Sequence, residues 1–480
     1  MDILCSTVTD DMEVTSICCD SRNAEPGSLF IAYSGYDFDG NDYISMAINK
    51  GSVAVVCERK PDINVPYVLV RDGRIAMATI SAIWFDHPSK ELHVIGITGT
   101  NGKTTITYLI KSILEQSGAK VGLIGTIKNM IGNQTIENKS GCTTPESFQL
   151  QELLRQMVDA GCKYVVMEVT SSGLLLHRVD STVFSVGIFT NLTEDHLDYH
   201  KTMEAYGDAK ALLFERCPIS VLNRDDPAWE KMKSHAMGKV LTYSIHDKKA
   251  DMLARNIQLK MNRVEAEVAF DNNACNLELA IPGLFSVYNA LAAILCVVSL
   301  GFDFTNTITA LRYTQGVKGR MEQVPTYGHD FTIIIDFAHT PDALENVLHT
   351  VRGFTKGNII LVLGCGGDRD PYKRPIMGEI ASRLSDYVVV TSDNPRTEEP
   401  MAIIRDIVNG MKVSSKPYTI IENRCAAIDW AMDHAQKDDV IILAGKGHET
   451  YQILGHNKIH LDEREVVAAH LAQREKFINV

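Results

Sequence analysis

The segment GITGTNGKTT, residues 96–105, decides the fold class of this 480-residue chain. The apolar run HVIGIT that contains its first residues predicts a strand. TTITYLIKSILEQSG, which follows, predicts a helix that ends at Gly118. Gly99 and Gly102 permit tight turns between the two elements, and backbone N–H groups in such turns can point at phosphate oxygens. A strand, a glycine-rich loop and a helix in this order indicate an α/β nucleotide-binding sheet.

Two side chains complete the predicted phosphate loop. Lys103 can reach the terminal phosphates of a nucleotide, and the Thr104 hydroxyl can bind Mg²⁺. The common form of the motif has glycine at position 97, where this chain has Ile97. We therefore interpret the segment as a shortened variant. A glycine-rich turn without a ligand is the alternative, but the strand and the helix lie where phosphate binding requires them.

A phosphate loop also needs an acid at the end of a neighbouring strand. The predicted strand KYVVMEV supplies Glu168 after a run of apolar residues. Because acids are rarely buried in such strands without a partner, we interpret Glu168 as a metal ligand.

TEDHLDYH, residues 193–200, places three carboxylates and two histidines in eight positions. It could be a solvated turn, a zinc site or one wall of a magnesium site. The spacing of His196 and His200 on a helix suits zinc, but no third ligand follows at a familiar spacing. The segment comes after the predicted strand SVGIFTNL, so we expect it at the same sheet edge as the phosphate loop, with His196 near a second metal beside Glu168.

Apolar strands alternate with helices along most of the chain, which predicts parallel sheets covered on both faces. The pattern restarts near residue 325 with TIIIDFAH, NIILVLGC, DYVVVTSD, YTIIEN and DDVIILAG. We predict an α/β protein with a small N-terminal domain at 1–88, a central nucleotide domain at 89–324 and a doubly wound, Rossmann-like domain at 325–480.

Charge and composition exclude several classes of function. The net charge of -13 makes a broad nucleic-acid surface unexpected. The N-terminus lacks the features of a signal peptide, and the longest apolar run, 291–300, is too short to span a bilayer. Eleven cysteines without a CxxC pair indicate reduced thiols. We expect a cytoplasmic protein without a membrane partner.

Together the motifs resemble the Mur ligases, which form amide bonds in peptidoglycan precursor synthesis. The N-terminal DSRNAEPGSLFIAYSGYDFDGNDYI is similar to that family's uridine-nucleotide domain. The motifs that follow in family order are TGTNGKTT, TTPES, MEVTSSGLLLHRVD, TNLTEDHLDYH, YNALAA, GRME, DFAHTPDAL, GCGGDRDPYKRP, SDNPR and GKGHE. The resemblance covers almost the whole chain. It implies an ADP-forming ligase that works as a monomer, with ATP as co-substrate and two Mg²⁺ ions.

The resemblance also assigns roles by position. The catalytic and metal-binding positions are Lys103, Thr104, Glu168, His196 and Lys210, the last as a carbamylated lysine (N6-carboxylysine). The ATP-binding positions are Gly99, Thr100, Asn101, Gly102, Lys103, Thr104, Thr105, Asn289, Arg320 and Asp336. The positions that bind a UDP-N-acetylmuramoyl-dipeptide are Ser21, Thr143, Thr144, Thr170 and Arg178. Asn41, Thr170, Ser172, Leu176 and Ser286 depart from the residues usual in the family.

Three C-terminal strands end in GCGGDRD, SDNPR and AGKGHE, whose loops are expected at one sheet edge. The residues predicted to bind the added amino acid are Arg369, Asp393, Asn394, Arg396, Gly445 and Glu449. Arginines that grip a carboxylate and a glutamate that receives an ammonium group suit a zwitterion. SDNPR resembles the family form that adds meso-diaminopimelate to UDP-N-acetylmuramoyl-L-alanyl-D-glutamate.

Two further functions remain open. The departures from the family pattern fit a diverged paralogue that adds another amino acid, such as L-lysine, or that only binds UDP-muramoyl peptides. A phosphate-loop hydrolase is the third hypothesis. It lacks support because the chain has no guanine-reading NKxD motif and because a hydrolase does not need the zwitterion site.

Overall fold

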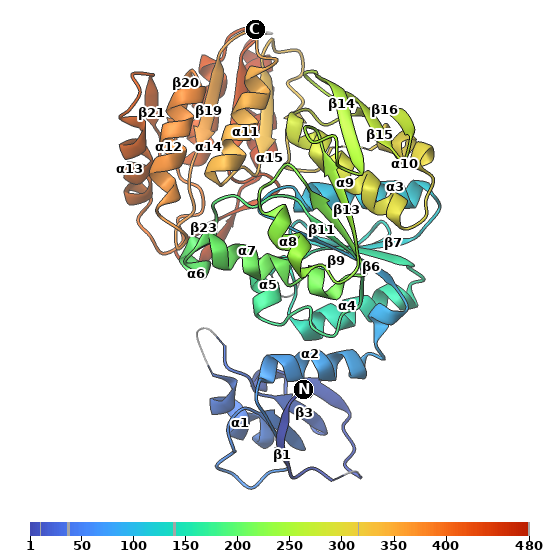
Figure 1. The fold of residues 1–480 in the computed structure, drawn as a ribbon. Coiled ribbons are helices and arrows are strands. Elements are labelled where there is room, and N and C mark those ends of the chain that lie inside the picture. Colours follow the sequence, from blue (N-terminus) through green and yellow to red (C-terminus); the bar gives the residue numbers. More distant parts are fainter. Residues whose placement is uncertain (10, 36–38, 138–140, 315, 479–480) are drawn as a thin grey trace. The chain divides into compact units, whose positions relative to one another are not determined.

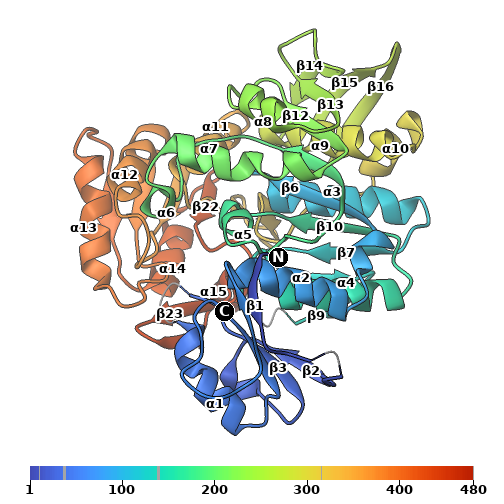
Figure 2. The same cartoon turned by 60° about the horizontal axis from the view of Figure 1, so that its bottom comes forward.

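The computed structural model (Figures 1 and 2) describes residues 1–9, 11–35, 39–137, 141–314 and 316–478. By their internal contacts, these residues divide into two compact units. Unit 1 comprises residues 1–98, 118–187 and 212–218, and unit 2 comprises residues 99–117, 188–211 and 219–480. Residues 36–38 of the N-terminal motif lie outside the described residues. The predicted domain boundaries after residues 88 and 324 stay predictions.

Unit 1 begins with a five-stranded sheet in the order β1-β5-β4-β3-β2. Its strands are β1 (Ile3–Ser6), β2 (Ser16–Cys18), β3 (Ser28–Ile31), β4 (Ala54–Cys57) and β5 (Tyr67–Val70). β2 to β5 run parallel, and β1 pairs antiparallel with β5. Helix α1 (Ile44–Asn49) packs on one face with Phe30 and Val55, and helix α2 (Gly73–Trp84) packs on the other face with Ile31 and Val56.

The second part of unit 1 carries the strand that leads into the phosphate loop. β10 (Tyr164–Glu168) lies between β6 (His93–Thr98) and β7 (Val121–Ile124), and all three run parallel. β8 (Asn129–Ile131) and β9 (Gln134–Ile136) extend this ladder in antiparallel directions. The helices here are α4 (Ser147–Asp159) and α5 (Ser171–Leu175). Glu168 is the last residue of β10 and lies opposite Ile97 of β6, so the acid reaches the carboxyl edge of the strands.

Unit 2 begins with the loop and its helix, α3 (Lys103–Gln116), which packs against α9 (Leu284–Ser299). Parallel strands β12 (Ile219–Asn223), β13 (Lys239–Ser244) and β14 (Met252–Leu259) continue into an antiparallel meander with β15 (Val264–Phe270) and β16 (Asn273–Leu279). The remaining elements are β11 (Phe184–Phe189), which crosses the boundary between units, and α6 (Leu197–His200), α7 (Met203–Ala211), α8 (Trp229–His235) and α10 (Phe304–Leu311). The apolar run 291–300 is mostly buried in α9, against the sheet.

The C-terminal part of unit 2 is a six-stranded sheet in the order β17-β18-β22-β19-β20-β21. Its strands are β17 (Glu322–Val324), β18 (Thr332–Asp336), β19 (Ile359–Leu363), β20 (Tyr387–Val390), β21 (Tyr418–Ile420) and β22 (Val440–Ala444). All run parallel except β17. Helices α11 (Pro341–Arg352), α12 (Lys373–Leu384) and α13 (Pro400–Met411) cover one face, and α14 (Arg424–His434) and α15 (Glu463–Ile478) cover the other. This arrangement is the doubly wound sheet that the sequence predicts.

A two-stranded hairpin, β23 (Tyr451–Leu454) and β24 (Asn457–His460), follows β22 and lies outside the main sheet. Arg396 forms an isolated parallel bridge with Leu454 of this hairpin. Within the described ranges, no helix is long and apolar enough to cross a membrane.

Candidate active site

The phosphate loop has a backbone that depends on its glycines. Gly99 has φ of 141° and Gly102 has φ of 89°, both in the region that favours glycine. A Cβ on Gly99 would lie 1.8 Å from Thr190 Oγ1, and a Cβ on Gly102 would lie 2.6 Å from Asn289 Oδ1. Both positions therefore favour glycine for conformation, and a Cβ at either one would also displace a neighbouring side chain. The loop ends at the N-terminus of α3, whose backbone N–H groups suit an anion.

Lys103 lies across this loop. Its Nζ donates hydrogen bonds to the carbonyl oxygens of Gly99 and Thr100, each at 2.8 Å. The Thr100 hydroxyl donates to the carbonyl of Thr193 and accepts from the Thr193 N–H. The Asn101 N–H donates to the Asn191 side chain at 2.9 Å. The segment after β11 thus holds the loop in shape, a role that the sequence prediction does not assign to it.

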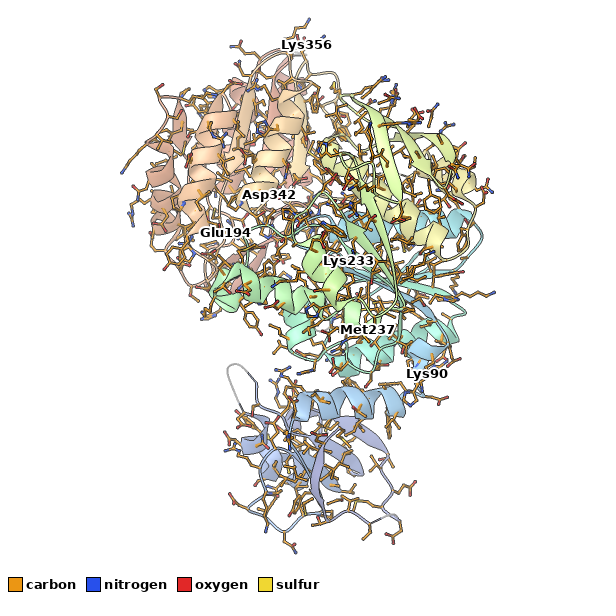
Figure 3. The ribbon with its side chains drawn as sticks, in the orientation of Figure 1. Lys90, Glu194, Lys233, Met237, Asp342 and Lys356 are labelled. Atoms are coloured by element: carbon orange, nitrogen blue, oxygen red, sulfur yellow. The ribbon has the colours of Figure 1, made fainter. Side chains whose placement is uncertain are left out.

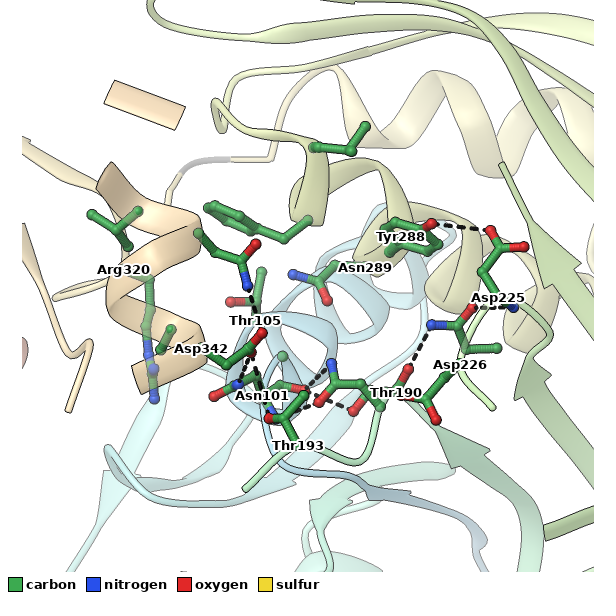
Figure 4. Close-up of a pocket in the computed structure, with 18 of the residues that line it drawn as sticks. Asn101, Thr105, Thr190, Thr193, Asp225, Asp226, Tyr288, Asn289, Arg320 and Asp342 are labelled. Atoms are coloured by element: carbon green, nitrogen blue, oxygen red, sulfur yellow. Dashed lines mark hydrogen bonds between the residues drawn. The ribbon is translucent and has the colours of Figure 1, made fainter. Parts of the chain in front are cut away.

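A cavity of about 340 Å³ opens beside the loop (Figure 4). Six of the predicted ATP-binding residues line it, namely Asn101, Gly102, Thr105, Asn289, Arg320 and Asp336. The sequence prediction missed other lining residues, including Asn223, Asp225, Asp226, Phe285, Tyr288 and Asp342. Figure 4 shows that Tyr288 points toward Asp225, and its hydroxyl donates to the Asp225 carboxylate at 3.0 Å.

Two contacts connect the loop segment with the C-terminal sheet inside unit 2. Asn101 Nδ2 donates to Asp342 Oδ2 at 2.7 Å, and Asp342 belongs to the first turn of α11 (Figures 3 and 4). Arg320 Nη2 donates to Thr104 Oγ1 at 3.3 Å. Asp336 accepts the Met321 N–H at 2.7 Å. Burial raises the pKa of the Asp336 carboxyl, and the nearby Arg320 guanidinium opposes that shift.

Lys210 is wholly buried on α7 at the base of the same loop. Its Nζ donates to the carbonyl oxygen of Gly99 at 3.0 Å and lies 4.1 Å from the centroid of the Tyr206 ring. Burial, and then the charge of Lys103, hold the pKa of the Lys210 amine well below its ordinary value. A buried lysine with a lowered pKa favours the neutral amine, which is the nucleophilic form.

TEDHLDYH forms a turn and the short helix α6. His196 precedes α6 with φ of 55°, and its side chain is 56% exposed. The Asp195 carboxylate is buried, accepts the His196 N–H at 2.9 Å and lies 3.9 Å from Lys373 Nζ. His200 is buried and packs against Tyr206. Among the residues that the structure describes, no group of three or more His, Cys, Asp or Glu side chains could hold a metal ion.

In unit 1, Glu168 lies within a network of threonines. Its buried carboxylate accepts the Thr126 N–H at 2.9 Å and the Thr126 hydroxyl at 3.0 Å. The Thr126 hydroxyl also lies 3.0 Å from the Thr143 hydroxyl. Thr144 donates to the Glu168 carbonyl and lies 3.1 Å from the Thr170 hydroxyl. The structure therefore brings Thr143, Thr144, Glu168 and Thr170 together.

Arg178 joins this network from the segment after α5. Its Nη1 donates to the Thr144 carbonyl at 3.1 Å, and its Nη2 forms an ion pair with Glu146 at 2.7 Å. Arg74 of α2 pairs with the other oxygen of Glu146 at 3.5 Å. Ser21 belongs to the N-terminal sheet region, where it is buried with its hydroxyl 3.3 Å from the sulfur of Met46.

The C-terminal cluster comprises Arg369, Asp393, Asn394, Arg396, Gly445 and Glu449. Arg396 and Arg369 flank Gly366, since a Cβ there would lie 3.0 Å from Arg396 Nη1 and 3.9 Å from Arg369 Cγ. Burial, and then the charge of Arg369, lower the pKa of Arg396. Two neighbouring guanidinium groups favour an anionic ligand.

The acidic half of this cluster is held by internal hydrogen bonds. Asn394 Nδ2 donates to Glu449 Oε2 at 2.9 Å. Gly445 has φ of 110°, and a Cβ there would lie 2.7 Å from Asp393 Oδ2. The structure thus brings predicted residues from three strand ends together. It also adds Lys446, a fully buried lysine that the sequence prediction does not include.

Comparison with known proteins agrees with this architecture. Residues 13–95 match the catalytic domain of the Mur ligase family, residues 97–297 match the Mur ligase middle domain and residues 319–447 match the Mur ligase glutamate ligase domain. The chain is 50% identical over 471 residues to UDP-N-acetylmuramoyl-L-alanyl-D-glutamate–2,6-diaminopimelate ligase from Caldanaerobacter subterraneus subsp. tengcongensis, covering 97% of this chain and 96% of the relative. The chain belongs to the Mur ligase family.

Other relatives support the same assignment. A ligase of the same name from Geobacillus thermodenitrificans is 43% identical over 471 residues, with 96% of each chain covered. A solved structure with that name has a TM-score of 0.70 at 30% identity and covers 96% of this chain and 95% of its own. The MurF ligase from Thermotoga maritima, at 19% identity and a TM-score of 0.67 over 97% of this chain and all of its own, shares the fold. The predicted family and three-domain α/β fold are confirmed, and as a Mur ligase the chain is an ATP-dependent, ADP-forming amide-bond ligase.

Proposed function

We propose that this Mur ligase adds meso-diaminopimelate to UDP-N-acetylmuramoyl-L-alanyl-D-glutamate, with ATP converted to ADP and phosphate. The observation that carries the choice of amino acid is the C-terminal cluster, in which Arg369 and Arg396 flank Gly366 and Glu449 is anchored nearby. The names of the relatives at 43% and 50% identity point to the same reaction.

The cluster fits the distal end of a diamino dicarboxylic acid. Guanidinium groups bind a carboxylate through two parallel hydrogen bonds, and a carboxylate such as Glu449 receives an ammonium group. The distal end of meso-diaminopimelate carries both of these groups. L-lysine lacks the distal carboxylate and would leave the arginines without an anionic partner. We therefore assign Arg396 as the main ligand of the distal carboxylate of meso-diaminopimelate and Arg369 as a second contact.

We assign ATP to the cavity beside the phosphate loop. Gly99 to Thr105 would surround the phosphates, with Lys103 moving from the loop carbonyls to the β- and γ-phosphate oxygens. Asn289, Arg320 and Asp336 line the cavity and would contact the base, the phosphates and the ribose, respectively. A cationic lysine beside the phosphates would stabilise the negative charge that moves during phosphoryl transfer.

We further propose that Lys210 is carbamylated. The neutral amine attacks the carbon of CO₂, a C–N bond forms, one C=O electron pair moves to oxygen, and the amine proton leaves to water. The burial of Lys210 and the lowered pKa of its amine favour this step. The product is an anionic carbamate, which supplies oxygen ligands at a position where an ammonium group would repel a metal.

The side chains proposed as metal ligands are of chemical types that suit Mg²⁺. In unit 2, Thr104 would supply a hydroxyl oxygen, carbamylated Lys210 two carbamate oxygens and His196 a ring nitrogen, and in unit 1 Glu168 would supply carboxylate oxygens. Oxygen donors are the ligands that Mg²⁺ prefers. When bound, two Mg²⁺ ions would neutralise the repulsion between the substrate carboxylate and the γ-phosphate.

The acceptor would bind in unit 1, through the hydroxyls of Thr143, Thr144 and Thr170, the guanidinium of Arg178 and the hydroxyl of Ser21.

The acceptor's carboxylate oxygen attacks the γ-phosphorus, and the bond between that phosphorus and the bridging oxygen breaks to release ADP. The amine of the amino acid then attacks the acyl carbon, and a C–N bond forms. The C–O bond to phosphate breaks, and the amine proton leaves to solvent.

We propose a monomeric, cytoplasmic enzyme, since ATP and UDP-linked precursors are available in the cytoplasm.

The proposal is tested by measuring ADP release from ATP with UDP-N-acetylmuramoyl-L-alanyl-D-glutamate, with and without meso-diaminopimelate. The ligase requires all three substrates. A hydrolase would release ADP from ATP alone, and a paralogue that only binds muramoyl peptides would release none in any mixture. Either of these results would overturn the proposal.

A further inference from the structure

Lys446 is a fully buried lysine next to the proposed amino-acid site, and the reaction described above does not use it. It is 0% exposed and follows Gly445 at the end of β22. Its Nζ donates to Glu449 Oε2 at 2.9 Å and to Asn394 Oδ1 at 3.2 Å. Burial of a charged side chain is costly unless it is paired. The pairing of Lys446 with Glu449 meets that requirement. Because Glu449 belongs to the C-terminal cluster, the pair places the Lys446 ammonium group directly beside that cluster.

The two oxygens of Glu449 have different surroundings. Oε2 accepts two internal hydrogen bonds at 2.9 Å, from Lys446 Nζ and from Asn394 Nδ2. Among the residues that the structure describes, Oε1 accepts a single long hydrogen bond, 3.3 Å, from the Tyr451 hydroxyl. One oxygen is therefore saturated from inside the protein. The other keeps acceptor capacity for an ammonium group.

The Asn394 amide is fixed in the orientation that this arrangement needs. Its Oδ1 accepts from the Ile453 N–H at 3.0 Å as well as from Lys446, so its Nδ2 is directed to Glu449. Gln452 Nε2 donates to the Asp393 carbonyl at 2.6 Å. Lys446 is thus part of a hydrogen-bonded frame that joins the SDNPR loop, the GKGHE loop and strand β23.

We infer that Lys446 is a positioning residue that orients Glu449 so that Oε1 receives the distal ammonium group of the incoming diamino acid. This inference rests on the proposed function. Lys446 does not contact the substrate itself. Its removal would free the Glu449 carboxylate to rotate and would leave Oε2 with one donor. Binding of the diamino acid would weaken, and ATP binding would not change.

The test compares Lys446→Met with Lys458→Met in steady-state kinetics. Lys458 is exposed and lies 3.7 Å from the centroid of the Tyr451 ring, so it controls for loss of a nearby positive charge that does not bond to Glu449. Lys446→Met should raise the KM for meso-diaminopimelate at least tenfold, with the KM for ATP within twofold of the unmutated enzyme. Lys458→Met should change neither constant by more than twofold. If Lys446→Met does not fold, Lys446→Gln carries the same test.

A double variant separates positioning from a general effect. In the Glu449→Gln background, Lys446→Met should raise the KM for the diamino acid by less than twofold, because the carboxylate it positions is gone. An equal rise in both backgrounds, or no rise in the single variant, overturns the inference. The unmutated enzyme is measured first. If it does not use meso-diaminopimelate, the proposed function fails, and the inference is then tested with whichever amino acid the enzyme does use.

Discussion

The Nζ of Lys210 donates a hydrogen bond to the carbonyl oxygen of Gly99 at 3.0 Å, so a helix lysine contacts the first glycine turn of the phosphate loop. Lys103 Nζ donates to the same carbonyl at 2.8 Å. Two lysines that share one acceptor repel each other when both are charged. The proposed conversion of Lys210 to an anionic carbamate would remove this repulsion and would add metal-binding oxygens beside the loop.

Lys210→Ala should lose nearly all ligase activity and still fold, because alanine keeps the helix propensity of α7. Acetate or another small carboxylic acid should partly restore turnover by occupying the position of the carbamate. Turnover at saturating substrates, with and without acetate, is the measurement, and thermal melting checks the fold. Near-normal turnover of Lys210→Ala at low magnesium would show that the carbamate has no role.

Arg396→Ala should raise the KM for meso-diaminopimelate and leave the KM for ATP almost unchanged. Loss of a bidentate contact to a buried carboxylate costs on the order of 2–4 kcal/mol, which is about 30-fold or more in kcat/KM. Arg405→Ala is a suitable control, because Arg405 is exposed on α13, outside the cluster. A parallel rise in the KM for ATP would mean that the change is not confined to the amino-acid site.

Gly102→Ala should abolish ATP binding, and Gly118→Ala should not. The two glycines have nearly equal φ, 89° and 86°, so an added methyl group strains both backbones alike. At Gly102 the new Cβ meets Asn289 Oδ1 at 2.6 Å, whereas at Gly118 it meets no atom of the described residues within 4 Å apart from its own chain neighbours. Nucleotide binding is measured by calorimetry with a non-hydrolysable ATP analogue. Equal losses in the two variants would assign the effect to backbone strain alone.

Stability should fall as the pH drops from 7 to 5, in part because of His339, which is partly buried. Burial lowers the pKa of its ring to about 4. In the unfolded chain this ring therefore takes up a proton near pH 6.5, whereas in the folded protein it stays neutral until the pH nears 4. The stabilisation that is present above pH 6.5 is lost as the pH falls toward 4, and this residue alone lowers the free energy of unfolding by about 2 kcal/mol between pH 7 and pH 5. Urea unfolding of His339→Gln should show a shallower dependence on pH than the parent. His456→Gln, at an exposed turn, should match the parent, and equal slopes for parent and His339→Gln would contradict the assignment.

Sequence patterns predicted the parallel strands and the phosphate loop well, because a strand buried on both faces is a continuous apolar run. They also placed Glu168 correctly at the end of β10. They missed β12 to β16, and β14, β15 and β16 contain half-buried and exposed residues in place of a continuous buried run. They also began helix α3 one residue late, since Lys103 already has helical geometry.

The missed site residues share a physical reason. Asp225, two residues after the end of β12, and Tyr288 of α9 line the cavity from positions far apart in the chain, and no local motif marks their contact. Asp342 meets Asn101 across 241 positions. Lysine is a residue type that is usually exposed, and the burial of Lys446 depends on Glu449 and Asn394, which come from two different loops. Such contacts depend on the packed tertiary structure rather than on spacing.

The most direct test of the central claim is a competition between amino acids. The enzyme is given ATP, UDP-N-acetylmuramoyl-L-alanyl-D-glutamate and equal concentrations of meso-diaminopimelate and L-lysine, and the products are separated by mass. We expect the diaminopimelate-containing tripeptide to form almost alone, together with one ADP for each amide bond. Efficient formation of the lysine product, with diaminopimelate ignored, would contradict the role given to Arg369, Arg396 and Glu449.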